Sequence, residues 1–584
     1  MVKRGKAILI LSICILIVLN SVLAVVYLIP LSTLKVWINN NSNRVSIDNG
    51  MIKIEIDPAG KATLMEYNKR DLIGERGNFY MSYAVDEGET KFYNLNNPIM
   101  EVIRQTPELV EVMYRDTTGP IIIELHYVVL KGSSGCYAFV VAEGKTDPAI
   151  MMELRVVYRA NPDIFNYAYT SDDVQGFMPT PAELEDAEAV QDATYLLDDA
   201  SIYTKYDWAN YIDEDLVHGL MGNANGMWLM QSSKEYVNGG PDRQELMVHQ
   251  TDTTPLVLSM LQGEHFGALA QVFGEGDEKL YGPFFLYVNS GENHQEMIDD
   301  AKEKAIAEQA AWPYDWMQHP LFELQRSTVI GNISTGAGGP LENAMIVLAK
   351  DPVNVYDQGK DYIFWTKANN DKTFSIPNVI PGNYTLFVYG ANRTDDLMVE
   401  NVTVTNQSIT DIGQINWTVN SSLQLLWQLG DADRRSLGFR YCDYPRQYGL
   451  WELVPSNLTF NINMSIESTD WYYAQTKIGS WKIEFNNSIN YTGGETAMLT
   501  IGIAGVARYP DLDVYLNSTS LSSFSFGNEG SIYRSAINSG RYRVKTVSFP
   551  ASNLSVGINA IDLRLIDVSE KGGIMYDVIK LEVF

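Results

Sequence analysis

Two arginines stand four residues apart in a segment whose polar and apolar residues alternate. The run Met152-Glu-Leu-Arg-Val-Val-Tyr-Arg159 has the period of a β-strand, so Arg155 and Arg159 are expected to point to the same face. Two positive charges on one face repel each other unless an anion lies between them. The pair therefore predicts an anion-binding site, and a solvated strand face is the alternative interpretation.

A second group of ionisable and aromatic residues lies between residues 203 and 267. It contains the runs Tyr203-Thr-Lys-Tyr-Asp-Trp-Ala-Asn-Tyr211 and Gln262-Gly-Glu-His-Phe-Gly267. Three of the six histidines fall in this segment, and the further candidate residues are His218, Arg243, His249 and His265. Such a density of titratable groups in a β-rich segment predicts a polar functional site.

Two other kinds of site stay open on these residues alone. His218, His249 and His265 lack the short spacings of strong metal motifs, although distant strands could still bring them together. A glycosidase would need two carboxylates flanking the bond, and the sequence singles out no pair among Asp207, Asp213, Glu235, Asp242 and Glu264. No Gly-x-Ser-x-Gly or phosphate-binding loop is present. We expect no metal and no cofactor.

The elements that position these residues are expected to be β-strands. The length of 584 residues predicts about two to four domains. Alternating segments punctuated by Gly, Pro and Asp predict a large antiparallel sandwich over residues 45–325. Its one clear helix is expected at 292–311, where Trp312-Pro313 ends it.

Two further β-rich units follow. Short, evenly spaced strands over residues 326–418 predict a small sandwich of immunoglobulin or fibronectin type, with a spacer role. Residues 419–584 predict a jelly roll whose first third is rich in aromatic residues. These either stack on sugar rings or fill the core: Trp427, Phe439, Tyr441, Tyr444, Tyr448, Trp451, Trp471, Tyr472 and Tyr473.

The N-terminal segment, residues 1–44, predicts export. Lys3, Arg4 and Lys6 precede an apolar stretch over residues 7–30, which is typical of a signal peptide or a membrane anchor, and a short linker follows. We therefore expect an extracellular protein that is secreted or tethered to the cell membrane. The formal net charge of −29 argues against a nucleic-acid partner, and an anionic substrate would need a local positive site. The sequence gives no indication of the oligomeric state.

Several motifs resemble the rhamnogalacturonan lyases of polysaccharide lyase family 4. In the first unit they are the two runs above together with Leu130-Lys-Gly-Ser-Ser-Gly, the Arg155/Arg159 pair, Val217-His-Gly and Asn238-Gly-Gly-Pro. In the third unit they are Arg446-Gln-Tyr-Gly-Leu-Trp-Glu, Asp470-Trp-Tyr-Tyr-Ala-Gln and Gly573-Ile-Met-Tyr-Asp-Val-Ile-Lys-Leu-Glu. The similarity covers residues 45–584 in the same order, so its collinearity is more specific than any one motif.

The resemblance implies an all-β fold: a mutarotase-like β-sandwich, a fibronectin-III-like sandwich and a carbohydrate-binding-like jelly roll. Lys205 matches the catalytic lysine of the family and His265 its catalytic histidine, and Arg155 and Arg159 match a pair associated with substrate binding. We expect Tyr203, His218, Arg243 and His249 to be further substrate-binding or supporting residues. Leu258 and Met260 replace tyrosines that precede the histidine in some members.

The implied activity is an endolyase that cuts the rhamnose–galacturonate bond of rhamnogalacturonan I, a pectic polysaccharide, by β-elimination. The arginines would neutralise the uronate carboxylate, and the same positive charge would favour an uncharged Lys205 amine that removes the C5 proton. His265 would donate to the leaving oxygen or orient the sugar. The alternatives are a non-catalytic pectin-binding surface protein and a mutarotase-like sugar epimerase, because fold alone does not fix function.

Overall fold

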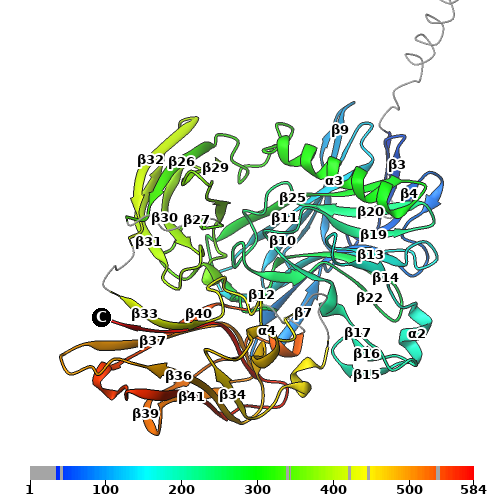
Figure 1. Ribbon diagram of the computed structural model, residues 1–584. Coiled ribbons are helices and arrows are strands. Elements are labelled where there is room, and N and C mark those ends of the chain that lie inside the picture. Colours follow the sequence, from blue (N-terminus) through cyan, green and yellow to red (C-terminus); the bar gives the residue numbers. More distant parts are fainter. Residues whose placement is uncertain are drawn as a thin grey trace, which may run out of the picture.

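The structure, a computed structural model, describes residues 35–39, 44–336, 341, 343–418, 423–442, 448–534 and 540–584. The described chain forms three β-domains that follow one another along the sequence (Figure 1). The predicted all-β fold class is confirmed. The expected signal peptide or anchor lies outside the described residues. Within them, we find no helix with the length and apolar character needed to span a membrane.

The first domain is a sandwich of two large sheets. The eleven-stranded sheet contains β1 (Lys35–Asn39), β2 (Arg44–Asp48), β3 (Ile52–Ile56), β4 (Ala62–Tyr67), β6 (Asn78–Asp86), β12 (Ala149–Arg159), β23 (Pro255–Gln262) and β22 (Val248–Gln250) in that order, with β5 (Arg70–Asp71), β7 (Thr90–Asn94) and β24 (Gln271–Phe273) beside it. The nine-stranded sheet has the order β14 (Gln175–Phe177), β13 (Tyr167–Tyr169), β19 (His218–Gly222), β20 (Asn225–Met230), β25 (Glu278–Ser290), β11 (Gly135–Glu143), β10 (Ile122–Leu130), β9 (Leu109–Asp116) and β8 (Ile99–Gln105).

Period-two patterning explains why these segments form a sandwich. In β3 the three isoleucines are buried while Lys53 and Glu55 are half-buried, so each strand presents one apolar face to the space between the sheets. One continuous apolar core fills that space. The outer faces of the two sheets are consequently the surfaces that can carry a helix or a site.

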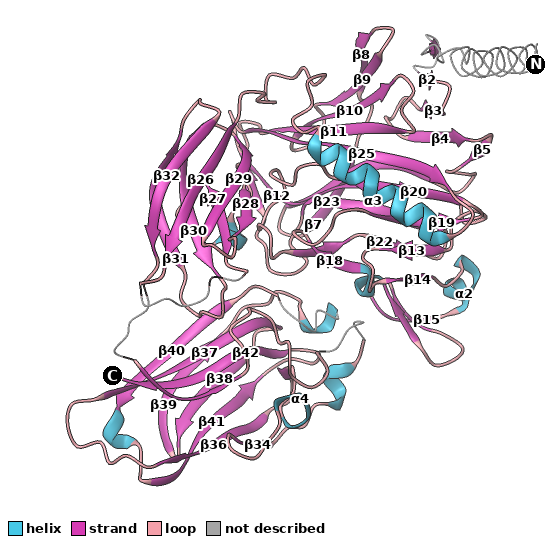
Figure 2. Ribbon diagram, turned by 45° about the horizontal axis from the view of Figure 1, so that its top comes forward, coloured by secondary structure: helices cyan, strands magenta, loops and turns pink. Residues whose placement is uncertain are grey.

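A helix covers the outer face of the nine-stranded sheet. The helix predicted at 292–311 is α3 (His294–Ala310), whose N-terminus is capped by Asn293. Met297 and Ile298 of α3 pack with Trp228 of β20 in a second apolar cluster, and Figure 2 shows α3 lying across the strands of this sheet. The outer face of the eleven-stranded sheet is therefore the one left for the functional residues.

Small elements lie next to that outer face. They are α2 (Pro181–Asp186), the sheet β15 (Glu188–Gln191), β16 (Thr194–Leu196) and β17 (Ile202–Thr204), the 3₁₀ helix η1 (Lys205–Trp208), and the pair β18 (Ala209–Tyr211) and β21 (Gln244–Leu246). The β16–β17 hairpin leads directly into η1, which begins with Lys205.

The second domain consists of two small facing sheets. One contains β29 (Thr373–Val379), β26 (Ser327–Ser334) and β32 (Ile409–Asn416), and the other contains β28 (Phe364–Lys367), β27 (Met345–Ala349), β30 (Gly382–Tyr389) and β31 (Leu397–Val404). Short strands were predicted over residues 326–418, and these seven strands lie within that range.

The third domain is a larger sandwich of two five-stranded sheets. One contains β33 (Gln424–Leu429), β42 (Gly573–Val583), β37 (Thr496–Ala507), β40 (Arg543–Pro550) and β35 (Ala474–Gln475); the other contains β34 (Leu458–Asn461), β36 (Gly479–Asn487), β41 (Gly557–Asp567), β38 (Asp511–Leu516) and β39 (Thr519–Ser525). Five of the aromatic residues considered for sugar stacking are at most 5% exposed and belong to the core: Trp427, Phe439, Trp451, Trp471 and Tyr473. The core interpretation holds for these five, and Tyr444 lies outside the described residues.

A buried ionic network holds the outer side of the nine-stranded sheet. His126 on β10 lies 2.9 Å from Glu111 and 3.5 Å from Glu124, and its ring stacks on Phe139 at 4.1 Å. Burial alone would lower the pKa of His126, but the two carboxylates outweigh it and raise the pKa above 6.5. The same contacts lower the pKa values of Glu111 and Glu124 below 4.5, although burial opposes this.

This network predicts a pH-dependent contribution to stability. The stabilisation due to His126 is complete below the pKa of about 6.5 in the unfolded chain, and it is lost as the pH rises through the higher pKa in the folded protein. The stabilisation due to the glutamates is present above about pH 4.5, and it is lost as the pH falls through their lower pKa values in the folded protein. His126→Asn should therefore lower the melting temperature most between about pH 5 and about pH 6.5, and less at alkaline pH. Thermal melts of both proteins across this range test the expectation, and a difference independent of pH would contradict it.

Candidate active site

Strand β12 carries both arginines on the outer face of the eleven-stranded sheet. Tyr158 belongs to the core between the two sheets, whereas Val157 belongs to a separate apolar cluster on the opposite side. Because side chains alternate along a strand, Arg155 and Arg159 share the face of Val157. The structure thus places the two arginines on one face, as the spacing indicates.

The two arginines differ in their partners. Arg155 donates to a serine hydroxyl on β6 at 2.9 Å and lies 3.4 Å from the carboxylate of Glu153. Arg159 donates to hydroxyl groups, those of Thr251 and Thr254 at 3.4 and 3.3 Å. Within the described part of the chain, Arg159 forms no ion pair. Its charge is therefore available to an anionic ligand.

Lys205 is held beside the arginine-bearing sheet by its own hairpin. Its backbone N–H donates to Ala193, and its ammonium group lies 2.7 Å from Asp192 and 5.1 Å from the ring centre of Tyr206. Burial opposes ionisation of Asp192, but Lys205, and to a smaller extent His265, hold the pKa of Asp192 below its usual value. The direct partner of Lys205 is thus a carboxylate, where the sequence predicted arginines.

His265 lies in the loop after β23 and is bracketed by two carboxylates. Its Nδ1 lies 2.8 Å from Glu245, and its Nε2 lies 3.7 Å from Glu153. Although burial opposes it, His265 and then Arg243 hold the pKa of Glu245 below its usual range. The ring of His265 is 6.4 Å from that of Tyr206, the residue that follows Lys205.

His249 joins the lysine to the arginine end of the site. On β22 it pairs with Leu256, which in turn pairs with Arg159 on β12. Burial, followed by the positive charges of Lys205 and Arg159, lowers the pKa of His249 to about 3. The four residues Arg155, Arg159, Lys205 and His265 therefore belong to one site, and we call them the basic cluster.

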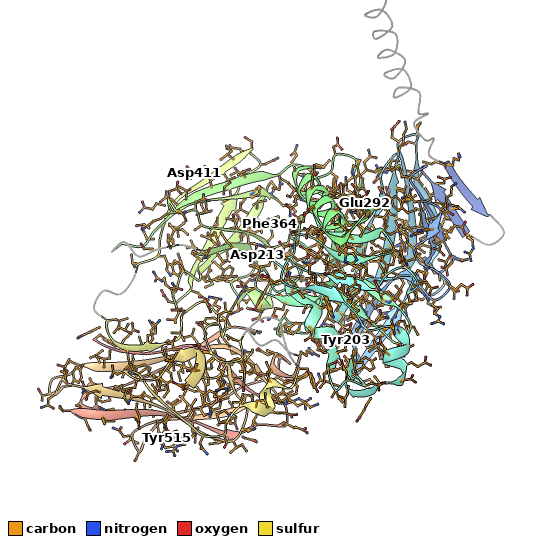
Figure 3. The ribbon with its side chains drawn as sticks, turned by 45° about the vertical axis from the view of Figure 1, so that its right-hand side comes forward. Tyr203, Asp213, Glu292, Phe364, Asp411 and Tyr515 are labelled. Carbon is orange, nitrogen blue, oxygen red and sulfur yellow. The ribbon has the colours of Figure 1, made fainter. Side chains whose placement is uncertain are left out.

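Three other predicted residues are buried behind this cluster. Tyr203, labelled in Figure 3, is 7% exposed and its hydroxyl accepts from the backbone of Gln250. His218 is fully buried between Asp215 and the carbonyl of Leu258. In these positions, Tyr203 and His218 are poorly placed to contact a substrate.

Arg243 is likewise enclosed. It is 1% exposed, lies 3.2 Å from Glu245 and donates to the carbonyl of Met260 at 2.7 Å. It reaches His265 only through Glu245, so its position is that of a support for the histidine. A role of Arg243 in contacting substrate stays a prediction that its burial does not favour.

The structure adds three carboxylates that were not among the candidates from sequence. Glu153 stands two residues before Arg155 and Glu245 two residues after Arg243, so strand alternation could have placed each acid with its arginine. Asp192 reaches Lys205 only because the β16–β17 hairpin folds back, and no local pattern marks it. These acids separate positive groups that would otherwise repel one another.

The sequence left two alternative kinds of site open, a metal site and a glycosidase site. Among the described residues, the three histidines considered as ligands have separate partners, and donor atoms within 4.8 Å of one another are found in Glu124 and His126 on β10 together with His319. Asp213 and Glu235 lie at a cavity of about 400 Å³ that also borders Phe364 of the second domain (Figure 3).

Comparison with known proteins gives the same three-part division. Residues 338–412 match the model for domain II, and residues 425–581 the model for domain III, of polysaccharide lyase family 4. Residues 30–201 match the rhamnogalacturonate lyase family. The rhamnogalacturonate lyase of Dickeya dadantii (strain 3937) is 36% identical over 96% of this chain and 97% of its own. Rhamnogalacturonate lyase B of Emericella nidulans is 24% identical over 90% of this chain and 92% of its own.

Solved structures resemble the separate domains only weakly. A galactose mutarotase-like protein from Lactobacillus casei aligns over its whole length with 42% of this chain, at 9% identity and a TM-score of 0.26. A family 35 carbohydrate-binding module aligns with 18% of this chain over 65% of its own length, at 18% identity and a TM-score of 0.13.

The chain therefore has the domain organisation of a polysaccharide lyase. The match to the Dickeya dadantii enzyme covers nearly the whole of both chains, including the segments that carry Lys205 and His265. The protein belongs to the rhamnogalacturonate lyase family, polysaccharide lyase family 4.

The site geometry predicts that removing the Lys205 charge raises the pKa of His249. Lys205→Met should move that pKa from about 3 towards its ordinary value, because one of the two positive neighbours is lost. NMR titration of ¹³C-labelled histidine, with His249→Gln to assign the signal, measures the shift. Lys131→Met, which removes a lysine paired with Glu108, is the control. An unchanged His249 titration would place Lys205 outside the site.

Proposed function

We propose that the chain cuts rhamnogalacturonan I within its backbone, at the bond from rhamnose to galacturonate, by β-elimination. Family membership supports the substrate class. The single observation that carries the chemistry is the basic cluster, gathered on one sheet face of a protein whose formal net charge is −29. An acidic polysaccharide would supply a carboxylate to Arg159, which has no ion-pair partner among the described residues.

The arginines suit the first requirement of the reaction, which is to neutralise the uronate carboxylate. The C5 proton is too weakly acidic while that carboxylate keeps its full charge, and an enolate develops as the proton leaves. A guanidinium group can hold a carboxylate through two parallel hydrogen bonds. Arg159 has only hydroxyl partners among the described residues, so it is the better placed of the two arginines to bind the uronate carboxylate. The four residues of strand between Arg155 and Arg159 separate their Cα atoms by about 13 Å, so each arginine can bind a different acidic sugar.

Lys205 suits the second requirement, a base for the C5 proton. The amine accepts this proton, the C4–C5 double bond forms, and the C4–O4 bond breaks. Lys205 must be uncharged to accept this proton, and without substrate its side chain lies 2.7 Å from Asp192. Asp192 would then hold Lys205 in place between turnovers.

His265 suits the third requirement, protonation of the departing oxygen. That oxygen leaves on the rhamnose, and it needs a proton as the C4–O4 bond breaks. Glu245 and Glu153 on either side of the imidazole fix the ring plane, as carboxylates do for catalytic histidines. The products are a chain ending in rhamnose and a chain beginning with an unsaturated galacturonate.

We also propose that the protein works outside the cell, where a polymeric pectin is accessible. The positively charged residues Lys3, Arg4 and Lys6 before the apolar residues 7–30 support export. Whether this segment is removed as a signal peptide or kept as a membrane tether decides between secretion and anchoring.

Lys205→Ala should abolish the formation of unsaturated product, because the base is gone while the surrounding carboxylates and arginines stay. We expect kcat to fall by about 10²-fold to about 10⁴-fold. The assay measures the ultraviolet absorbance of the new double bond together with the viscosity of the polymer. Lys131→Ala, which breaks a comparable lysine–glutamate pair on the other sheet, should behave as wild type. Nearly normal turnover by Lys205→Ala would remove the base assignment. Polymer binding without product from the wild type would favour a non-catalytic pectin-binding protein.

Arg159→Lys should lower kcat/KM by roughly tenfold or more. The charge remains, but the two parallel hydrogen bonds to a carboxylate are lost, and a charge-assisted bond contributes about 1.5–3 kcal/mol. Arg115→Lys, whose arginine pairs with Glu124 and Glu143 on the other sheet, is the matched control. Equal kcat/KM values for Arg159→Lys and wild type would show that Arg159 does not hold the uronate.

A further inference from the structure

The third domain reaches the basic cluster through the segment that follows β39. The short 3₁₀ helix η4 (Ile532–Arg534) ends with Arg534, whose guanidinium group donates to the backbone carbonyl of His265. The same guanidinium lies 5.6 Å from the ring centre of Tyr206. Arg534 thus contacts the residue next to Lys205 and the backbone of His265 at the same time.

A second contact of the third domain is made to Gln191, at the end of β15. The Gln191 amide nitrogen donates to the carbonyl of Tyr533 at 2.9 Å, and its amide oxygen accepts from the Tyr448 hydroxyl at 3.2 Å. Lys571 in turn donates to that hydroxyl at 3.0 Å. Both polar ends of one side chain are therefore held by the third domain.

Gln191 directly precedes Asp192 in the sequence, so the contacts of Gln191 also affect the position of Asp192. The next residue, Asp192, lies 2.7 Å from Lys205 and accepts from the Tyr206 hydroxyl at 3.3 Å. Besides its contacts with Lys205 and Tyr206, Asp192 is held through its backbone carbonyl, which accepts from the Thr194 hydroxyl at 3.1 Å. Because adjacent Cα atoms are separated by a fixed 3.8 Å, a displaced Gln191 displaces Asp192 with it.

Contacts remote from the cluster hold the third domain in place. Arg435 lies 2.6 Å from Glu214 and stacks 3.8 Å over the ring of Tyr211, both in the first domain. Arg541 lies 2.5 Å from Asp357 in the second domain. Figure 1 shows the third domain packed along one side of the other two. The contacts at Gln191 and Arg534 therefore belong to a fixed arrangement of the three domains.

We propose that the third domain is a positioning part of the active site: Tyr448 and Tyr533 hold Gln191, and thereby Asp192 against Lys205, while Arg534 holds the loop of His265. This rests on the proposed roles of Lys205 and His265. Gln191 and Arg534 are positioning residues, since neither reaches the reacting atoms. The role differs from sugar binding, for which the buried aromatic residues of this domain offer little surface.

Full-length variants test the proposal. Gln191→Ala and Arg534→Ala should each lower kcat by about 10-fold to about 100-fold with KM changed less than about twofold, as loss of a supporting contact does. Arg534→Lys, which keeps a donor for the His265 carbonyl, should recover part of kcat. Tyr448→Phe, which removes only one hydroxyl, should act in the same direction as Gln191→Ala and guards against misfolding of the larger changes. The matched control is Arg564→Ala: like Arg534, Arg564 lies over a tyrosine ring, that of Tyr515, which Figure 3 shows well away from Tyr203, and it pairs with Asp562.

The pKa of His249 gives a readout that needs no activity. If Gln191→Ala lets Lys205 move, that pKa should rise above its value of about 3, whereas a contact that only stabilises the domain boundary would leave it unchanged. A raised KM with unchanged kcat would assign these residues to substrate binding and overturn the proposal. So would wild-type kinetics in Gln191→Ala and Arg534→Ala when Lys205→Ala is inactive. An active Lys205→Ala would instead remove the base assignment on which this proposal rests.

Discussion

Repulsion between positive charges is the constraint on which this site depends. Two arginines, a lysine and a histidine occupy one face of one sheet, and such a set would move apart without negative charge between its members. Three carboxylates supply part of that charge: Glu153 between Arg155 and His265, Glu245 behind His265, and Asp192 on Lys205. Arg159 has no such partner among the described residues, and this is where an acidic sugar fits the arrangement best.

The fold places this set on one outer sheet face. Helix α3 packs on the outer side of the nine-stranded sheet, and the outer side of the eleven-stranded sheet carries the two arginines. Leu258 and Met260 form the apolar floor below the cluster and are almost fully buried. The hairpin before η1 and the loop after β23 then bring Lys205 and His265 over that floor from positions 60 residues apart in the chain.

Strand alternation made the arginine pair and the sandwich predictable, and the segment that ends at Trp312-Pro313 made helix α3 predictable, because each depends on residues close together in sequence. The resemblance to a known family supplied Lys205 and His265, which no local pattern would have linked. The surroundings of Lys205 were not predictable: a carboxylate 13 residues away is its partner, through a hairpin whose geometry the sequence does not reveal. The burial of His218, Arg243 and five aromatic residues of the third domain was not predictable either. The sequence alone does not show whether a titratable or aromatic residue lies at the surface or in the core.

The most direct test of the central claim is a crystal structure of the Lys205→Ala protein with an oligosaccharide of alternating rhamnose and galacturonate. The account predicts a galacturonate carboxylate at the Arg159 guanidinium, with C5 of that sugar facing the space left by the lysine side chain and O4 towards His265. An oligosaccharide bound elsewhere, or one whose carboxylates face solvent while Arg159 stays with its two threonines, would contradict it.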